Sequence, residues 1–118
     1  MFYIYTIPGI PDSLNRFAGR HNAWEYREKK NMWKNMVQLC CMPKPKMPIE
    51  KADVKIVYFF PDHKRRDPDN YCGKMILDGL TAAGIIKDDD FDHIELTVKK
   101  GGVDRNFPRV ELVIEETE

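Results

Sequence analysis

One nine-residue segment constrains the fold of this chain more than any other: residues 52–60, with the sequence ADVKIVYFF. Side chains alternate between the two faces of a strand, and one face here is apolar throughout: Val54, Ile56, Tyr58 and Phe60. Val57 and Phe59 make the second half of the segment apolar on its other face as well. A strand that is apolar on both faces is typical of the interior of a sheet. The segment therefore predicts a central strand.

Five further elements are expected around this strand. Alternating or β-branched residues predict strands, and a helical repeat of apolar residues predicts helices: strands at 2–7, 94–98 and 110–114, and helices at 23–41 and from 69 to about 83. Because Gly101-Gly102 leads from one of the last two strands toward the other, we expect these two to form an antiparallel pair. The element order β-α-β-α-β-β predicts an α/β (α+β) fold with a small mixed sheet of about four strands and two main helices.

Length and cysteine content limit the class of protein. A chain of 118 residues is expected to form one domain, residues 1–118, and a small core of this size would gain stability from dimerisation. The apolar run at residues 1–7 is too short for a membrane helix and is followed by Pro8-Gly9, so no membrane association is expected. Three cysteines make no even disulfide framework. We therefore expect a reduced, cytoplasmic protein.

The formal net charge of zero conceals two oppositely charged halves. Residues 1–66 contain 13 Lys or Arg and 6 Asp or Glu, a net +7, whereas residues 67–118 contain 6 and 13, a net −7. Such asymmetry is typical of a basic nucleic-acid surface beside an acidic element, although both halves could also mix on the surface of one domain.

Two acidic segments are the candidates for chemistry. Asp67-Pro68-Asp69 would suit a helix start, and Asp88-Asp89-Asp90 would suit a hydrated turn, so each has an ordinary structural explanation. Together they suggest more, because carboxylates that gather at one place repel each other unless a divalent cation such as Mg²⁺ or Mn²⁺ neutralises them. The neighbouring run Lys64-Arg65-Arg66 supplies the positive charge that a phosphodiester requires.

An ordered set of motifs resembles the RusA family of Holliday junction resolvases, which are crossover junction endodeoxyribonucleases. The set is Arg65-Arg66-Asp67-Pro68-Asp69-Asn70, Lys74, Asp78-Gly79-Leu80-Thr81, Ala83-Gly84 and Asp88-Asp89. The N-terminal positions Pro8, Pro11, Ser13 and Asn15-Arg16 are also similar to that family. Five positions separate Asp69 from Lys74 here, where other members have four.

The resemblance implies a homodimer that binds branched DNA at four-way junctions and, with Mg²⁺ or Mn²⁺, makes two symmetrical nicks. It assigns the metal-site aspartates to Asp67, Asp69 and Asp89, the essential lysine to Lys74, and an arginine of the site to Arg66. From the chemistry of such a site, we expect hydroxide from a metal-bound water to attack phosphorus, while Lys74 and Arg66 stabilise charge on the phosphoryl oxygens.

Other residues are expected to support binding. Asn70 would orient a carboxylate or donate to the phosphate, or would make a helix-start hydrogen bond. Further contacts to the DNA backbone are expected from basic side chains: Lys64, Arg65, Arg16 and Arg20. Phe17, in a loop between arginines, is a candidate wedge at the junction.

Bringing the three aspartates together poses a geometric problem. A straight helix from Asp69 to Ala83 would separate its ends by about 20 Å. Either the loop after Gly84 doubles back to bring Asp89 to Asp69, or the partner subunit of a dimer supplies one carboxylate, and sharing across the dimer is our hypothesis. Asp88 or Asp90 could also replace Asp89 as ligand.

Three functions are compatible with the sequence. The first is a metal-dependent junction endonuclease acting in DNA recombination and repair, which we favour. The second is a non-catalytic junction or DNA-binding protein, and the third is a metal-dependent nuclease of other specificity, acting on flaps or RNA.

Overall fold

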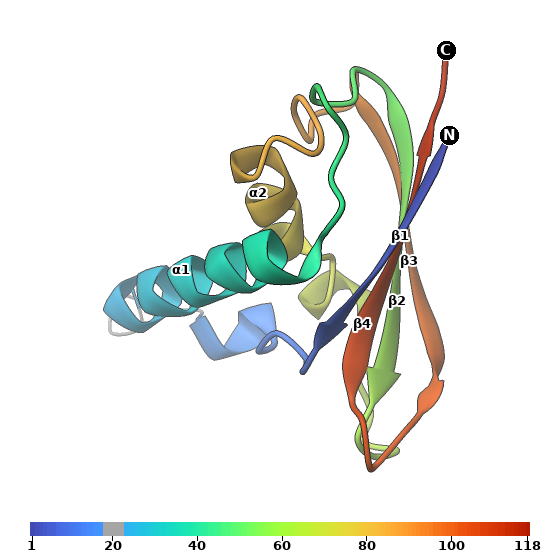
Figure 1. Cartoon of the computed structure of the whole chain (residues 1–118). Coiled ribbons are helices and arrows are strands. Elements are labelled where there is room, and N and C mark those ends of the chain that lie inside the picture. Colours follow the sequence, from blue (N-terminus) through green and yellow to red (C-terminus); the bar gives the residue numbers. More distant parts are fainter. Residues whose placement is uncertain (18–22) are drawn as a thin grey trace.

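A four-stranded mixed sheet with two helices on one face makes up the fold of the computed structural model, which describes residues 1–17 and 23–118 (Figure 1). The elements are β1 (Phe2–Pro8), η1 (Leu14–Phe17), α1 (Ala23–Cys40), β2 (Ala52–Phe60), η3 (Pro68–Asn70), α2 (Lys74–Ala82), β3 (Ile94–Val103) and β4 (Arg109–Glu116). The expected fold class and the order of strands and main helices are confirmed. None of the helices in the described ranges has the length and apolar character of a membrane span.

The sheet order is β1-β4-β2-β3, which places β2 in the interior as predicted. Ile56 of β2 lies opposite Leu112 of the antiparallel strand β4 and opposite Val98 of the parallel strand β3. The expected pairing of the last two strands is wrong, because β2 lies between them. Val110, Leu112 and Ile114 of β4 are fully buried, so β4 needs neighbours on both sides, whereas most of β3 is exposed and suits an edge.

The core lies between the sheet and the helices. Trp33 and Val37 of α1 are buried, as are four large apolar side chains of α2: Met75, Ile76, Leu77 and Leu80. The helices meet at Gly79, where an added Cβ would lie 2.8 Å from Cγ2 of Val37. Gly79 therefore allows a close approach that any larger residue would obstruct.

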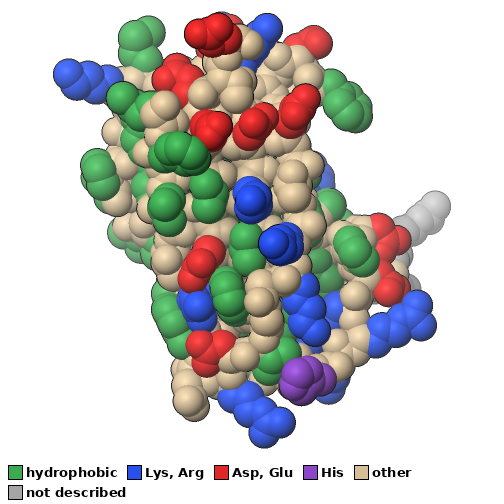
Figure 2. Space-filling model, turned by 90° about the vertical axis from the view of Figure 1, so that its right-hand side faces the viewer, with side chains coloured by type: hydrophobic (Ala, Val, Ile, Leu, Met, Phe, Trp, Pro, Cys, Tyr) green, Lys and Arg blue, Asp and Glu red, His purple; other side chains and the backbone are tan. Residues whose placement is uncertain are grey.

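No helix of the described residues covers the other face of the sheet (Figure 1), and Figure 2 shows the side chains on that face. Phe2 and Ile4 of β1 are 63% and 70% exposed on this side. The register aligns the acidic side chains of three strands, Glu115, Asp53 and Glu95, across one end of the sheet. This open face therefore combines exposed apolar side chains at the β1 edge with an acidic row.

Candidate functional site

The segment between β2 and α2 differs from its prediction. Residues 68–70 form only the 3-10 turn η3, and α2 begins at Lys74, so the expected helix start at Asp69 is wrong. Gly73 precedes α2 with φ +81°, and an added Cβ would lie 2.2 Å from Cδ1 of Ile56. Because Gly73 has a left-handed backbone conformation and lies close to the core of the sheet, α2 begins only after it. Asp69 and Lys74 consequently do not share a helix, and the extra residue between them lies in the irregular segment.

Arg66 fastens the start of this segment to the end of β2. Its guanidinium lies over the ring of Phe60, 4.4 Å from the centroid, and its Nη2 is 2.8 Å from Oδ1 of Asp62. Its Nη1 also donates to the carbonyl oxygens of Asp62 and Lys64, at 3.2 and 3.3 Å. The backbone N–H of Lys64 and the Arg66 guanidinium together lower the pKa of Asp62. The Arg66 side chain is only 16% exposed, so its charge is engaged within the chain.

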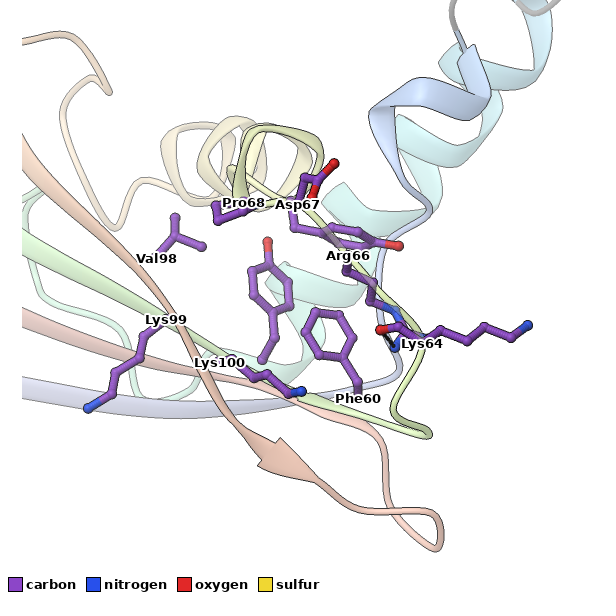
Figure 3. A pocket seen from close by; sticks show the side chains of 10 residues that line it. Phe60, Lys64, Arg66, Asp67, Pro68, Val98, Lys99 and Lys100 are labelled. Atoms are coloured by element: carbon purple, nitrogen blue, oxygen red, sulfur yellow. Dashed lines mark hydrogen bonds between the residues drawn. The ribbon is translucent and has the colours of Figure 1, made fainter.

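A small hollow, here called the lysine pocket, lies between this segment and β3 (Figure 3). Its volume is about 90 Å³, and its lining includes Phe60, Lys64, Arg66, Asp67, Val98 and Lys100. The ring of Phe60 stacks on that of Tyr58 with centroids 5.5 Å apart, which gives the pocket an aromatic floor. The pocket thus combines cations, an aromatic floor and the first predicted catalytic aspartate.

Asp67 and Asp69 are both exposed. Oδ1 of Asp67 accepts a hydrogen bond of 3.3 Å from Nε of Arg65. Asn70 is half-buried and lines a separate small hollow together with Asp12 and Lys74. The two predicted ligands Asp67 and Asp69 therefore lie on an accessible surface, with Arg65 already compensating the charge of one.

A wider hollow of about 680 Å³, here called the acidic hollow, lies along the same edge strand. Asp89 and Asp90 line it together with Leu77 of α2 and Leu96 of β3. Leu96 is two positions from Val98, which lines the lysine pocket, so the two residues share one face of β3. One edge of the sheet therefore carries Asp67 in one hollow and Asp89 in the next.

Lys74, the predicted essential lysine, forms an ion pair one turn along α2. Its Nζ lies 3.6 Å from Oδ2 of Asp78, and Nζ of Lys30 from α1 lies 3.5 Å from the same oxygen. This Oδ2 is buried and makes no hydrogen bond within the described residues. Partial burial, followed by the charge of Asp78, raises the pKa of Asp89.

The loop that carries Asp89 lies near α2. The loop after Gly84 returns toward α2, since Asp89 lines the acidic hollow together with Leu77 of α2. The sequence places Asp78 within the RusA-like motif and four positions after Lys74, but neither feature predicts its influence on Asp89. The spacing was the available signal, but it does not reveal what the later loop brings near.

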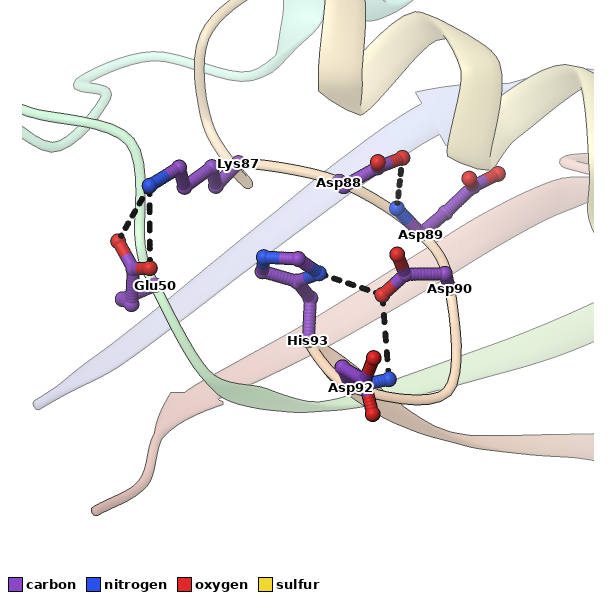
Figure 4. A network of polar contacts seen from close by, with 7 residues as sticks. All are labelled: Glu50, Lys87, Asp88, Asp89, Asp90, Asp92 and His93. Atoms are coloured by element: carbon purple, nitrogen blue, oxygen red, sulfur yellow. Dashed lines mark hydrogen bonds and ion pairs between the residues drawn. The ribbon is translucent and has the colours of Figure 1, made fainter.

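The three predicted metal ligands do not gather at one point within a single chain. Among the described residues, one group of three side chains, Asp88, Asp90 and His93, has ligand atoms within 4.8 Å of one another. Figure 4 shows Asp89 pointing toward α2, whereas Asp90 turns toward His93. His93 contacts Oδ1 of Asp90, which lowers the pKa of Asp90 and raises that of His93. This turn is exposed at both aspartates and has an ordinary structural explanation in these internal contacts.

The remaining predicted DNA contacts have different surroundings. Lys64 and Arg65 are exposed. Arg16 is half-exposed and pairs with Asp12, at 3.1 Å, and with Glu25. Arg20 lies outside the described residues. The candidate wedge Phe17 packs its ring against Tyr26, with centroids 5.3 Å apart.

Comparison with known proteins returned no match, either from a scan against protein-family models or from a search of curated proteins. The resemblance to the RusA family therefore rests on the motifs of this sequence alone.

Proposed function

We propose that this protein is a Mg²⁺- or Mn²⁺-dependent endodeoxyribonuclease that resolves four-way DNA junctions, as its resemblance to the RusA family implies. It acts as a homodimer in the cytoplasm, in DNA recombination and repair. Two symmetrical nicks require two equivalent active sites, which a homodimer supplies. The three cysteines are free thiols, as expected for a reducing compartment.

The observation that carries the proposal is the composition of the lysine pocket. Lys64 and Lys100 come from different parts of the chain and line the same hollow as Asp67. Phosphodiester hydrolysis needs cations that hold the phosphate and carboxylates beside it. The neighbouring acidic hollow adds Asp89 along the same edge strand.

The residues can accommodate a divalent cation even though the three carboxylates do not converge. Mg²⁺ is commonly held by one or two carboxylates, with water and substrate phosphate oxygens completing its coordination. Asp67, Asp69 and Asp89 are the residues that would hold it. The pKa of Asp89 is raised, so its ionised form is disfavoured in the chain alone, and a bound cation would stabilise that form. The chemistry supplied by the bound ion is a water of lowered pKa.

The side chains of the chain itself bind and orient the substrate. Lys74 stabilises negative charge on the phosphoryl oxygens, and its ion pair with Asp78 keeps its ammonium on the exposed side of α2. Lys64 and Arg65 contact the DNA backbone on the exposed loop. Arg66 holds that loop in place through Asp62 and Phe60.

A second candidate function is favoured by one observation. Because the predicted ligands remain apart, the protein could bind junctions without cutting them, and the acidic residues would then serve as caps and surface charge. A nuclease acting on flaps or RNA is the third candidate, since the same carboxylates and cations serve any phosphodiester.

The test uses a labelled synthetic four-way junction and a linear duplex with the same arm sequences. Each is incubated with the protein in Mg²⁺ or in EDTA, and wild type is compared with Asp67→Asn. The proposal predicts nicks on the junction that EDTA and the substitution both abolish, while junction binding persists. Binding without metal-dependent cutting would support the non-catalytic alternative.

A further inference from the structure

Lys100 occupies a position where the strand pattern predicts an apolar residue. Ile94, Leu96 and Val98 share the helix-side face of β3, and Lys100 is the next residue on that face. It lies opposite Tyr58 of β2, whose side chain is buried in the core. Figure 3 shows Lys100 extending toward Phe60, whereas Lys99 points away from it. A charged residue at an inward-facing strand position commonly marks a functional site.

The lysine pocket carries positive charge that the chain does not neutralise. Arg66 is paired with Asp62, and Asp67 is paired with Arg65. Within residues 1–17 and 23–118, neither Lys64 nor Lys100 has a carboxylate within 4.0 Å. The pocket is therefore suited to an anionic ligand.

The size and walls of the pocket indicate what kind of anion it would take. Sites for whole small molecules have volumes of roughly 300–1,000 Å³, and about 90 Å³ is room for only part of a larger ligand. Pro68 and Val98 provide an apolar wall. Tyr58 also lines the pocket. Cations beside an apolar wall suit the phosphate and sugar of a nucleic-acid backbone.

We propose that the lysine pocket binds one phosphodiester of a DNA strand, with Lys100 and Lys64 contacting the phosphate and the deoxyribose lying against Val98 and Pro68. The identity of the polymer rests on the function proposed above. Since Asp67 lines the same pocket, a strand bound there passes directly beside the predicted catalytic aspartate. Lys100 thereby extends the DNA-binding surface from the loop onto the edge of the sheet.

The experiment measures binding of a fluorescent four-way junction in EDTA at several NaCl concentrations. It compares wild type with Lys100→Gln and with Lys55→Gln, a control because Lys55 is an exposed lysine of β2 on the opposite face of the sheet and does not line the pocket. The slope of log K against log salt is negative, and the loss of one phosphate contact makes it less negative by about 0.9. We expect Lys100→Gln to show that change with about a 5- to 10-fold weaker affinity near 0.1 M salt. Lys55→Gln should change affinity less than about 2-fold, and Lys100→Arg should retain binding.

Each outcome separates this proposal from the function on which it rests. Unchanged binding by Lys100→Gln, or an equal loss in Lys55→Gln, would overturn the pocket while leaving junction cleavage intact. If wild type binds the junction but does not cut it in Mg²⁺, the nuclease function fails and a loss specific to Lys100→Gln still supports the pocket. If wild type binds no DNA, both proposals fail. Thermal unfolding of each variant confirms that folding is unchanged.

Discussion

Nζ of Lys74 lies 3.6 Å from Oδ2 of Asp78, one turn further along α2, and Lys30 reaches the same oxygen from α1 at 3.5 Å. The predicted essential lysine is thus half of a shared ion pair, and the Asp78 oxygen in this pair is buried and accepts no hydrogen bond from the described residues. Partial burial, followed by the charge of the same carboxylate, raises the pKa of Asp89. Asp78 therefore links the predicted catalytic lysine to the predicted metal ligand of the later loop.

Lys74→Ala is expected to reduce junction cleavage about 100-fold or more, because it removes a cation that stabilises the phosphoryl oxygens. The matched control is Lys30→Ala, which removes the other half of the shared ion pair. Both variants should lose less than about 1 kcal/mol of unfolding free energy, as expected for partly exposed ion pairs. Single-turnover cleavage rates and urea unfolding measure the two effects. Equal loss of cleavage in both variants would show that Lys74 acts only through the ion pair.

Asp89→Asn is expected to stabilise the fold near pH 7 while abolishing cleavage. Burial and the charge of Asp78 raise the pKa of Asp89, so its ionised form destabilises the folded state at neutral pH. We therefore expect a small rise in Tm at neutral pH. The gain should fade as the pH falls through the raised pKa, because protonated Asp89 is as neutral as asparagine.

The control for this prediction is Asp92→Asn, an exposed substitution in the same loop. Scanning calorimetry from pH 4 to pH 8 follows both variants. A Tm for Asp89→Asn that is unchanged or lower at pH 7 contradicts the account of Asp89.

Gly73→Ala is expected to destabilise the protein by about 3 kcal/mol or more. Alanine at position 73 would be strained by the positive φ, and its Cβ would also lie only 2.2 Å from Cδ1 of Ile56. Gly84 provides the comparison, because its φ of +75° is similar but no atom lies within 4 Å of its added Cβ. Gly84→Ala should cost only the backbone strain, about 1–2 kcal/mol. Guanidinium unfolding gives both values, and equal losses would mean that the contact with Ile56 is unimportant.

These positions show why the sequence predicted some features and missed others. Apolar residues on both faces of the segment 52–60 sufficed to place β2 inside the sheet. Alternation in 94–98 and 110–114 identified two strands. Alternation shows which face of a strand is buried, but it does not show which other strand pairs with it. The start of α2 depends on Gly73 meeting Ile56, a contact between distant parts of the chain that local propensity does not encode.

Some residues of the candidate site were likewise predicted from the sequence, and one was missed. The ordered motif located Asp67, Asp69, Lys74 and Asp89, and the structure brings Asp67 and Asp89 to neighbouring hollows of one edge. Lys100 was missed because the expected strand ended at Val98, whereas β3 continues to Val103. Its importance appears only when β3 is placed beside the loop that carries Lys64.

His93 is expected to titrate above its usual pKa of about 6.5 because of its contact with Asp90. A raised folded pKa means that the contact stabilises the protein below about pH 6.5, and that this contribution is lost as the pH rises through the folded pKa. NMR titration of the His93 ring measures the shift directly. In Asp90→Asn the pKa of His93 should fall, and a value independent of Asp90 would contradict the assignment.

The central claim is that the protein cuts four-way DNA junctions. Its most direct test is the initial rate of strand cleavage in Mg²⁺ on a four-way junction, a flapped duplex, a linear duplex and an RNA of matched sequence. The account predicts rapid cleavage of the junction, as paired nicks at symmetrical positions that ligase can seal, and little cleavage of the other substrates. Equal rates on flaps or RNA, or no cleavage of any substrate despite tight junction binding, would contradict it.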